Sequence, residues 1–494
     1  MHTNLRITVI ILLISTCAAL PARAIGCRTH ARITERAIER FLGPEAMCPG
    51  LRALFEVPEN RAAAYSGSYF PDWGYSGINQ DAGEATHWQP FYEVYAEVLA
   101  GRFPPPWDEA AQQEVAFFLG MMSHNIADLP WHFDNGGHKS FLTAAREYDN
   151  ASHQMTEVGC DLHLYTGPGL DPPMRGNLFW PVDTQLAAFS AAGLDVTRGQ
   201  LKAAEFRTSG LMVSAPLAGR ATAGKAMARM PWVKAHLGGY YYGGIEHCAA
   251  AAAVTFRHFH ARLTNRYYYQ RPPAYCEYRD TPEGAPRLRV ADTTLNEART
   301  FYNSGAEPLL EVGGSAGAKR RALIRFLLGE MPVDSRVQEA TLWLCLAEET
   351  GAAHTVAVHT MRRAWVEGAG ASDPVDGVAG RPGLPDAATW RNAGAGPWAA
   401  PGAAAAGDYS EEALDTVRVS GGRQAGAWVR WDVTEAVRAW AAESEKNFGL
   451  LVRGEEGTGT MRFYSSDAFR CQADGLGGGT RVAQRPVLIV APAA

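Results

Sequence analysis

The chain has 494 residues, of which 47% are hydrophobic and 10% aromatic, and its formal net charge is −6. This length exceeds that of one ordinary domain, and the apolar content suffices for more than one buried core. The acidic balance, without any basic block, argues against a protein held to nucleic acid mainly by electrostatics.

Residues 1–24 have the pattern of a secretory signal peptide. Arg6 precedes an apolar run, Ile7–Leu20, that is too short to span a membrane, and Ala22-Arg23-Ala24 supplies the small residues of a cleavage site. We therefore expect a secreted, extracellular protein whose mature chain begins at Ile25, with a signal anchor as the alternative. No later stretch has the roughly 18 consecutive apolar residues of a transmembrane helix.

Seven cysteines follow the cleavage site, and in an oxidising compartment some of them can pair. Proximity in the sequence suggests the pairs Cys27–Cys48 and Cys248–Cys276. The odd number leaves at least one thiol free, and no CxxC spacing indicates a structural zinc site.

Residues 25–270 are predicted to form an all-α domain. Apolar residues recur at helical spacing, as Ile33, Ala37, Ile38 and Phe41 do. Connections rich in Pro and Gly separate such segments, and strand-like alternation is sparse. The predicted helices are Thr29–Leu42, Gln89–Ala100, Ala111–Leu129, Arg146–Cys160 and Gly243–Asn265.

The composition changes at residues 271–286, which are predicted to be a linker, and residues 287–494 are predicted to form an all-β domain. Many short β-type runs separated by Gly, Asp and Pro are typical of a β-sandwich or jelly roll. Residues Gly368–Gly407 are poor in strand formers and are expected to be a long loop or insertion. The predicted strands are Leu309–Val312, Arg321–Leu328, Glu339–Leu346, His354–His359, Trp428–Val433, Phe448–Val452 and Val487–Val490.

Two metal-type side chains, His124 and Asp128, belong to the apolar stretch around the third predicted helix. Their i, i+4 spacing places both on one helix face, about 5–6 Å apart at Cβ, which is close enough to hold one metal ion. Pro130 is expected to break or kink the helix, so that His132 can serve a second ion. The alternative for this stretch alone is a buried, hydrogen-bonded histidine beside a surface aspartate.

Further imidazoles and carboxylates stand in short polar and aromatic motifs of the same domain. They are His30, Asp72, His87, His153 and Glu157. A set of nitrogen and oxygen ligands without thiolate fits catalytic zinc better than structural zinc, and carboxylate-rich sites also suit manganese or iron. Several such motifs in one helical domain predict a metal centre.

Residues 25 to about 270 resemble the zinc-dependent phospholipase C family, and within it the catalytic domain of the glycosylphosphatidylinositol-specific phospholipases D. The stretches that carry this resemblance, in the order of the family, are CRTHARITERAIERFL, YFPDWGY, EATHWQPFY, PPPWDEAAQQEVAFFLGMMSHNIADLPWH and GGIEHCAAAAA. The zinc-dependent single-strand nucleases share the same all-helical fold.

This resemblance implies three zinc ions. The expected ligands are Asp72, His87, His124 and Asp128 for the first ion, His132, His153 and Glu157 for the second, and His30, a bridging Asp128 and the amino group and carbonyl of Ile25 for the third. The nucleases have Trp where this chain has Ile25, but the ligating atoms there belong to the backbone. The resemblance also implies catalytic roles for Asp72, which would orient or deprotonate the attacking water, and for Asp128.

Residues 287–494 resemble the DNRLRE (disaggregatase-related) β-sandwich modules, which are similar to carbohydrate-binding modules of secreted enzymes. Among the stretches that carry this resemblance are ADTTLNEARTFYNSGAEPLLEVGG, KRRALIRFLL, SRVQEATLWLCL, VRWDVTEAVRAW, NFGLLVRG and RPVLIV. The implied role is adhesion to a polysaccharide or a cell surface. The alternative is a stabilising or spacing domain without a ligand.

These features predict a secreted trinuclear zinc phosphodiesterase that hydrolyses phospholipid or glycosylphosphatidylinositol-type substrates at a membrane surface. Clustered zinc ions would neutralise the anionic phosphodiester and lower the pKa of a water towards about 7. One alternative is a nuclease of the same fold, acting on nucleic acid. The other is a surface-binding or carbohydrate-binding protein with a degenerate helical domain.

Overall fold

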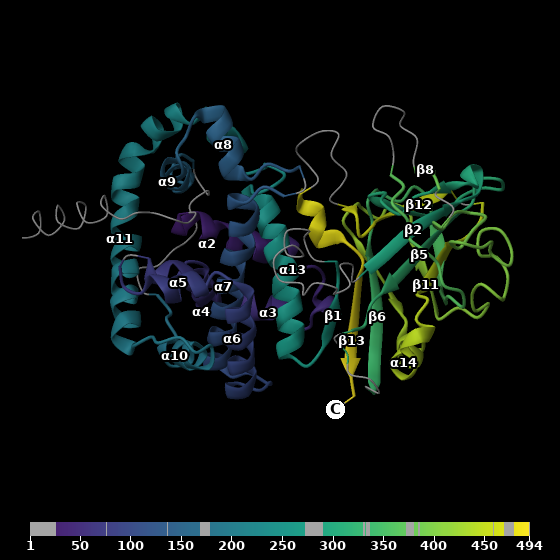
Figure 1. Ribbon diagram of the computed structural model, residues 1–494, viewed down its shortest axis with the longest axis horizontal. Coiled ribbons are helices and arrows are strands. Elements are labelled where there is room, and N and C mark those ends of the chain that lie inside the picture. The colour runs from purple at the N-terminus through teal and green to yellow at the C-terminus, as the bar shows by residue number, and fades with distance from the viewer. Residues whose placement is uncertain are drawn as a thin grey trace, which may run out of the picture. The chain divides into compact units, whose positions relative to one another are not determined.

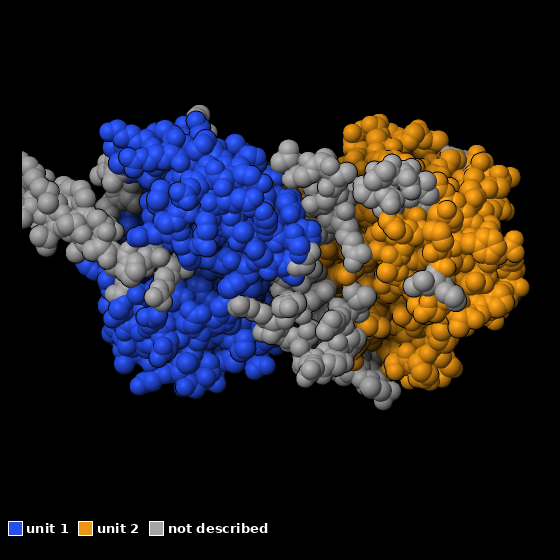
Figure 2. All heavy atoms as spheres, turned by 45° about the horizontal axis from the view of Figure 1, so that its top comes forward, with its two compact units in different colours: residues 1–263, 274–280 blue, residues 264–273, 281–494 orange. Residues whose placement is uncertain are grey.

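The computed structural model describes residues 26–75, 77–135, 137–167, 178–271, 290–329, 331, 336–371, 380–383, 386–457, 459–468 and 479–493. Its described residues form two compact units, of which the first ends at Leu263 and the second begins at Thr264 (Figure 1, Figure 2). The first unit is helical and the second is rich in strands, which confirms the predicted helical-plus-β organisation. The predicted signal peptide and nearly all of the predicted linker, residues 271–286, lie outside the described residues.

Helices make up most of the first unit. They are α2 (Cys27–Arg36), α3 (Leu51–Glu56), α4 (Pro58–Ser68), α5 (Gln80–Ala85), α6 (Gln89–Arg102), α7 (Glu109–His132), α8 (Phe141–Asp149), α9 (His153–His163), α10 (Val182–Ala191), α11 (Arg198–Arg229), α12 (Pro231–His236) and α13 (Ile245–Leu263). A π-helical turn, Ala37–Phe41, extends α2, and a 3-10 helix, Phe70–Gly74, follows α4.

The helix α7 lies in the middle of this unit, packed against α4 and α13. Every residue from 115 to 128 is buried, as expected for a helix that is apolar on all sides. Of the break or kink predicted at Pro130, the break is wrong, because α7 continues to His132. Pro130 stands in the last turn, where it removes one backbone hydrogen bond, and the fully buried Trp131 holds that turn in place.

One predicted helix, Arg146–Cys160, is wrong, because two helices occupy this stretch. Asn150 ends α8 with a φ of 51°, in the left-handed region that asparagine tolerates better than most residues. The Ser152 hydroxyl then caps α9 by accepting a hydrogen bond from the Met155 N–H at 3.2 Å.

Short antiparallel strands form most of the second unit. They are β1 (Tyr267–Tyr269), β2 (Val290–Asn296), β3 (Tyr302–Asn303), β4 (Leu309–Gly313), β5 (Arg320–Phe326), β6 (Val337–Cys345), β7 (His354–Thr360), β8 (Arg381–Pro382), β9 (Asp415–Val419), β10 (Trp428–Asp432), β11 (Leu450–Gly454), β12 (Thr460–Tyr464) and β13 (Val487–Pro492). A helix, α14 (Thr434–Ala442), follows β10.

Two sheets share one core in this unit. One sheet has the order β1-β13-β6-β10, and the other has the order β12-β4-β5-β11-β7-β9, with β2 added against β5. Their common core includes Leu342 and Val490 from the first sheet and Ile324 and Val358 from the second. All of the described strand pairings are antiparallel, so alternate residues of each strand face this core.

The strand β1 lies within the range predicted for the helical domain, residues 25–270. It pairs with β13 near the other end of the chain, Tyr268 opposite Ile489, and so it joins the second unit. The predicted insertion, Gly368–Gly407, has only the short strand β8 among its described residues. Its Trp390 and Trp398 pack against Leu323 and Leu451 in a second buried cluster.

Cys27 is a free thiol, so the predicted Cys27–Cys48 bridge is wrong. Cys248 is also a free thiol, and its predicted partner Cys276 lies outside the described residues. Burial raises the pKa of both thiols above the ordinary cysteine value. Among the described residues, no helix has both the length and the apolar character needed to cross a bilayer.

Candidate metal centre

The helix α7 carries three of the predicted ligands, His124, Asp128 and His132, at successive i, i+4 positions. The other helices of the unit bring further side chains towards this face. They are His30 of α2, Asp72 of the 3-10 helix, His87 after α5, and His153 and Glu157 of α9. Burial of the apolar residues on all sides of α7 therefore fixes three polar side chains inside the unit.

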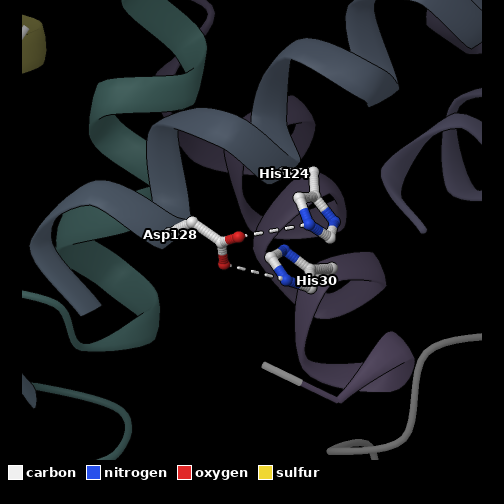
Figure 3. A group of neighbouring side chains, drawn as sticks. All are labelled: His30, His124 and Asp128. Atoms are coloured by element: carbon white, nitrogen blue, oxygen red, sulfur yellow. Dashed lines mark ion pairs between the residues drawn. The ribbon is translucent and has the colours of Figure 1, made fainter. Parts of the chain in front are cut away.

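His30, His124 and Asp128 form the innermost group (Figure 3). Asp128 Oδ1 lies 3.4 Å from His30 Nε2, and its Oδ2 lies 3.3 Å from His124 Nε2. The two imidazole rings stack with their centroids 3.6 Å apart. The carboxylate thus stands between two histidines, one on each of its oxygens, as a bridging ligand does.

Asp72, His87 and His124 form a second group that shares His124 with the first. Asp72 Oδ1 lies 3.4 Å from His87 Nε2 and 3.9 Å from His124 Nε2. Asp128 Oδ2 also lies 3.9 Å from His87 Nε2. Asp72 keeps 21% of its side chain exposed beside the two buried imidazoles, so it forms the solvent side of this group.

His132, His153 and Glu157 form a third group. His153 Nε2 lies 2.6 Å from Glu157 Oε1, and the rings of His132 and His153 have centroids 5.0 Å apart. His132 Nε2 also lies 3.8 Å from Asp128 Oδ1, which links this group to the other two. His153 is 39% exposed, so the third group opens to solvent.

Backbone carbonyls orient two of the histidines. His124 Nδ1 donates to the Ser68 carbonyl at 2.7 Å, and His87 Nδ1 donates to the Gly83 carbonyl at 2.9 Å. Each of these bonds leaves Nε2 as the ring nitrogen that faces the carboxylates. In metal-binding histidines, the ring nitrogen that does not face the metal usually donates a hydrogen bond to a carbonyl or carboxylate.

Several buried atoms of the site lack a hydrogen-bond partner. They include both ring nitrogens of His30, Nε2 of His87 and His124, and Oδ1 of Asp72 and Asp128. Buried polar atoms are costly unless they are paired. Converging imidazole nitrogens and carboxylate oxygens therefore fit a metal ion of the zinc type, which accepts both kinds of atom.

The charges of the site separate the pKa values of two stacked histidines. Burial, and then the charge on His124, lower the pKa of His30 to about 4. Burial also disfavours the charge on His124, but the carboxylates of Asp128 and Asp72 outweigh it and raise the pKa of His124 to about 9. Burial acts to raise the pKa of Asp128, but the charge and the hydrogen bond of His124 outweigh it and hold that pKa well below the ordinary value.

The structure thus brings together eight of the nine predicted ligands, and the ninth, Ile25, lies outside the described residues. Asp161 has a different role. Its Oδ1 accepts hydrogen bonds from the Thr29 N–H at 2.8 Å and the Thr29 hydroxyl at 2.9 Å. It therefore fixes the first turn of α2, which carries His30.

Three supporting groups had not been predicted. The carbonyls of Ser68 and Gly83 carry no side-chain signal, so the sequence alone could not reveal them. Asn125 donates its side-chain N–H to the His87 carbonyl. Asn125 stands next to His124 on an apolar helix, and a buried amide needs a hydrogen-bond partner. This position could therefore have suggested a supporting role for Asn125 at the site.

The fold and the site define a class of protein, in which a helical unit carries three linked groups of imidazoles and carboxylates that can hold metal ions. Residues 29–192 match the family described as zinc dependent phospholipase C. This match includes all eight residues of the three groups, from His30 near its start to Glu157 of α9. It supports zinc as the metal.

The chain is also similar to phosphatidylinositol-glycan-specific phospholipases D. It is 33% identical over 147 residues to the protein of Bos taurus, 35% over 112 residues to that of Homo sapiens and 28% over 156 residues to that of Dictyostelium discoideum. These matches cover 28%, 22% and 31% of this chain, but only 17%, 13% and 16% of the relatives. Together with the family match, they support a phospholipase or phosphodiesterase hydrolase.

Proposed function

We propose that the helical unit is a trinuclear zinc phosphodiesterase that hydrolyses phospholipid or glycosylphosphatidylinositol-type substrates. The observation that carries this proposal is the linkage of the three ligand groups, since His124 belongs to two of them and Asp128 approaches histidines of all three. The substrate class rests on the family match and on the relatives' names.

We propose the division of ligands among the ions that the family resemblance implies. Asp72, His87, His124 and Asp128 would hold one ion, His132, His153 and Glu157 a second, and His30, Asp128 and the backbone of Ile25 a third. When bound, zinc neutralises the phosphodiester and lowers the pKa of a water molecule. Asp72 would position that water and accept its proton, because it stands at the solvent side of the buried group.

The second unit is proposed to be a jelly-roll-like module of the DNRLRE type that holds the enzyme to a polysaccharide or a cell surface. Its two sheets over one core support the sandwich architecture. Secretion through the signal peptide at residues 1–24 belongs to the same proposal. An exported enzyme with such a module would meet its lipid substrate at an outer membrane surface.

Two amide variants test the proposed function. Asp128→Asn and Asp72→Asn each remove a charged ligand, so we expect zinc content to fall and hydrolysis to drop by at least about 100-fold. Glu109→Gln changes an exposed carboxylate of the same helix and should leave both unchanged. Elemental analysis gives the zinc content, and mass spectrometry of the products identifies the bond that is cut.

The substrates for this assay are phosphatidylcholine, a glycosylphosphatidylinositol-anchored protein and single-stranded DNA. If the products include diacylglycerol or phosphatidic acid, they support a phospholipase. Which of the two is released identifies the side of the phosphate that is cleaved. Release of nucleotides alone would replace the lipid proposal by the nuclease alternative. Hydrolysis at the original rate by both folded amide variants would refute the assigned site.

A further inference from the structure

Two of the proposed ligands, Asp72 and His87, lie outside the long helices of the first unit. Asp72 belongs to the 3-10 helix Phe70–Gly74, and His87 comes shortly after the end of α5. Nevertheless, Asp72 Oδ1 lies 3.4 Å from His87 Nε2. Because the hydrogen bonds of a 3-10 helix are poorer in geometry than those of an α-helix, contacts between the two segments are needed to maintain this distance.

The backbones of the two segments touch at a pair of glycines. A Cβ atom at Gly83 would lie 2.9 Å from the Gly74 Cα atom, and a Cβ atom at Gly74 would lie 2.8 Å from the Gly83 Cα atom. This close approach sets the distance between the backbones of the two segments. It leaves the orientation of the ligand side chains to other groups.

The Tyr75 side chain connects the two segments beside the ligands. Its backbone N–H donates to the Asp72 carbonyl at 3.2 Å, and its ring stacks on the His87 ring with centroids 5.2 Å apart. The Tyr75 phenol donates to Glu84 Oε2 at 2.7 Å. The His87 ring is therefore held by two groups, the Tyr75 ring and the Gly83 carbonyl that accepts from its Nδ1.

Glu84 holds the Tyr75 phenol, and a second hydrogen bond holds Glu84. Its Oε1 accepts from Trp88 Nε1 at 3.0 Å, while its Oε2 accepts from Tyr75. Turning the carboxylate would break at least one of these two bonds. Glu84 belongs to none of the three ligand groups, so its hydrogen-bonded link to them runs through Tyr75.

We infer that Tyr75 and Glu84 are positioning residues of the metal centre, which hold Asp72 and His87 at the spacing that one ion requires. This inference rests on the proposed function, because it concerns ligands of the same zinc centre. Groups that orient metal ligands without touching the ion typically contribute about 10–100-fold to metal affinity. The effect should be confined to one ion, since Asp72 and His87 serve only one of the three proposed ions.

Competition for zinc with a chromophoric chelator, on the full chain, measures the affinity of each ion. Glu84→Ala removes the acceptor of both hydrogen bonds and Tyr75→Leu removes the stacked ring, so we expect each variant to bind one ion at least about tenfold more weakly. Tyr75→Phe keeps the ring and loses only the phenol, so its loss of affinity should be smaller. Asp81→Ala changes an exposed carboxylate of the same helix and, as the matched control, should bind zinc as the original protein does.

Glu84→Gln separates positioning from charge, because its amide oxygen still accepts a hydrogen bond while the negative charge is removed. We expect this variant to lose less zinc affinity than Glu84→Ala. Equal losses in both variants would show that Glu84 acts through its charge and would overturn the inference. Cobalt in place of zinc adds a spectroscopic readout of ligand geometry. Its visible absorption should change in Tyr75→Leu and stay as in the original protein in Asp81→Ala.

Three further results would overturn the inference, and they differ in what they say of the proposed function. Unchanged zinc affinity in both Glu84→Ala and Tyr75→Leu, with zinc bound to the original protein, would leave the proposed function intact. Equal weakening of all three ions would indicate a general loss of structure, whereas we expect the metal-free variants to unfold at the same urea concentration as the metal-free original. Absence of zinc from the original protein would overturn the proposed function as well.

Discussion

At the scale of single residues, Asp128 has the most crowded surroundings of the described metal-type side chains. Its two oxygens lie between 3.3 and 3.9 Å from the Nε2 atoms of four histidines, which are His30, His87, His124 and His132. Its low pKa keeps it ionised at neutral pH. In the proposed zinc centre, this one charged carboxylate would therefore bridge ions that separate histidines hold.

The proposed third ion gives a prediction about processing. It requires a free amino group at Ile25, next to Gly26, whose carbonyl accepts the first hydrogen bond of α2 from the Thr29 N–H at 3.0 Å. One extra residue before Ile25 moves that amino group away from His30, so zinc content should fall from about three ions to about two. Elemental analysis of the extended and the correctly processed proteins measures this, and equal zinc content in both would exclude the terminal ligand.

Glu114 on α7 gives a prediction about pH. Burial raises the pKa of its carboxyl to about 7, above the ordinary value of 4.5. The folded state therefore holds a proton that the unfolded chain releases, and its contribution to stability is lost as the pH rises from 4.5 to 7. Glu114→Gln should be more stable than the original by about 2 kcal/mol at pH 8 and equally stable at pH 4.

Urea unfolding of the metal-free proteins, followed by circular dichroism at both pH values, measures this difference. Glu109→Gln lies on the exposed side of the same helix and should show no difference that depends on pH. A variant at Glu114 that is less stable than the original protein at pH 8 would contradict the argument.

At the scale of elements, the contact between α4 and α7 positions His124. A Cβ atom at Gly120 would lie 1.9 Å from the Ala64 carbonyl oxygen, so the two helices touch through their backbones. Gly120→Ala must push α4 away, together with the Ser68 carbonyl that orients His124. We expect a loss of about 3 kcal/mol in stability and a lower zinc affinity.

Gly101→Ala is the matched control for this prediction. Gly101 lies in the helix α6, where an added Cβ meets no atom within 4 Å. Removing its backbone freedom should raise stability by about 0.5–1 kcal/mol. Chemical unfolding and zinc titration of both variants compare the two effects, and equal stability of both variants would show that the close approach does not constrain the helices.

Periodicity in the sequence identified α2, α6, α7 and α13 because each of these helices has regularly spaced apolar residues or is apolar on all sides. It did not identify the long helix α11, whose alanine-rich and glycine-rich sequence has no marked apolar stripe. Periodicity also predicted a single helix where the structure has α8 and α9. The left-handed conformation of Asn150, which separates the two helices, is a feature of the backbone that the apolar pattern does not reveal. The i, i+4 spacing of His124 and Asp128 nevertheless predicted their proximity, because helix geometry alone fixes it.

At the scale of the whole molecule, the composition revealed two units, but long-range pairing decided where they divide. Nothing in the local sequence of Tyr267–Tyr269 indicates that this strand pairs with residues 488–490. The acid cluster of Asp292, Glu367 and Asp467 was equally hidden, since its members come from three separate segments. Long-range contacts of this kind depend on the complete fold, which local patterns do not determine.

The two units are expected to unfold separately on heating, because each has its own buried core. Zinc should stabilise the helical unit alone, by about 4 kcal/mol when free zinc is at a thousandfold excess over its dissociation constant. It should therefore raise the transition temperature of that unit only. Differential scanning calorimetry with and without zinc measures this shift, which Asp128→Asn should lose. A single transition that zinc shifts as a whole would show that the two units unfold as one.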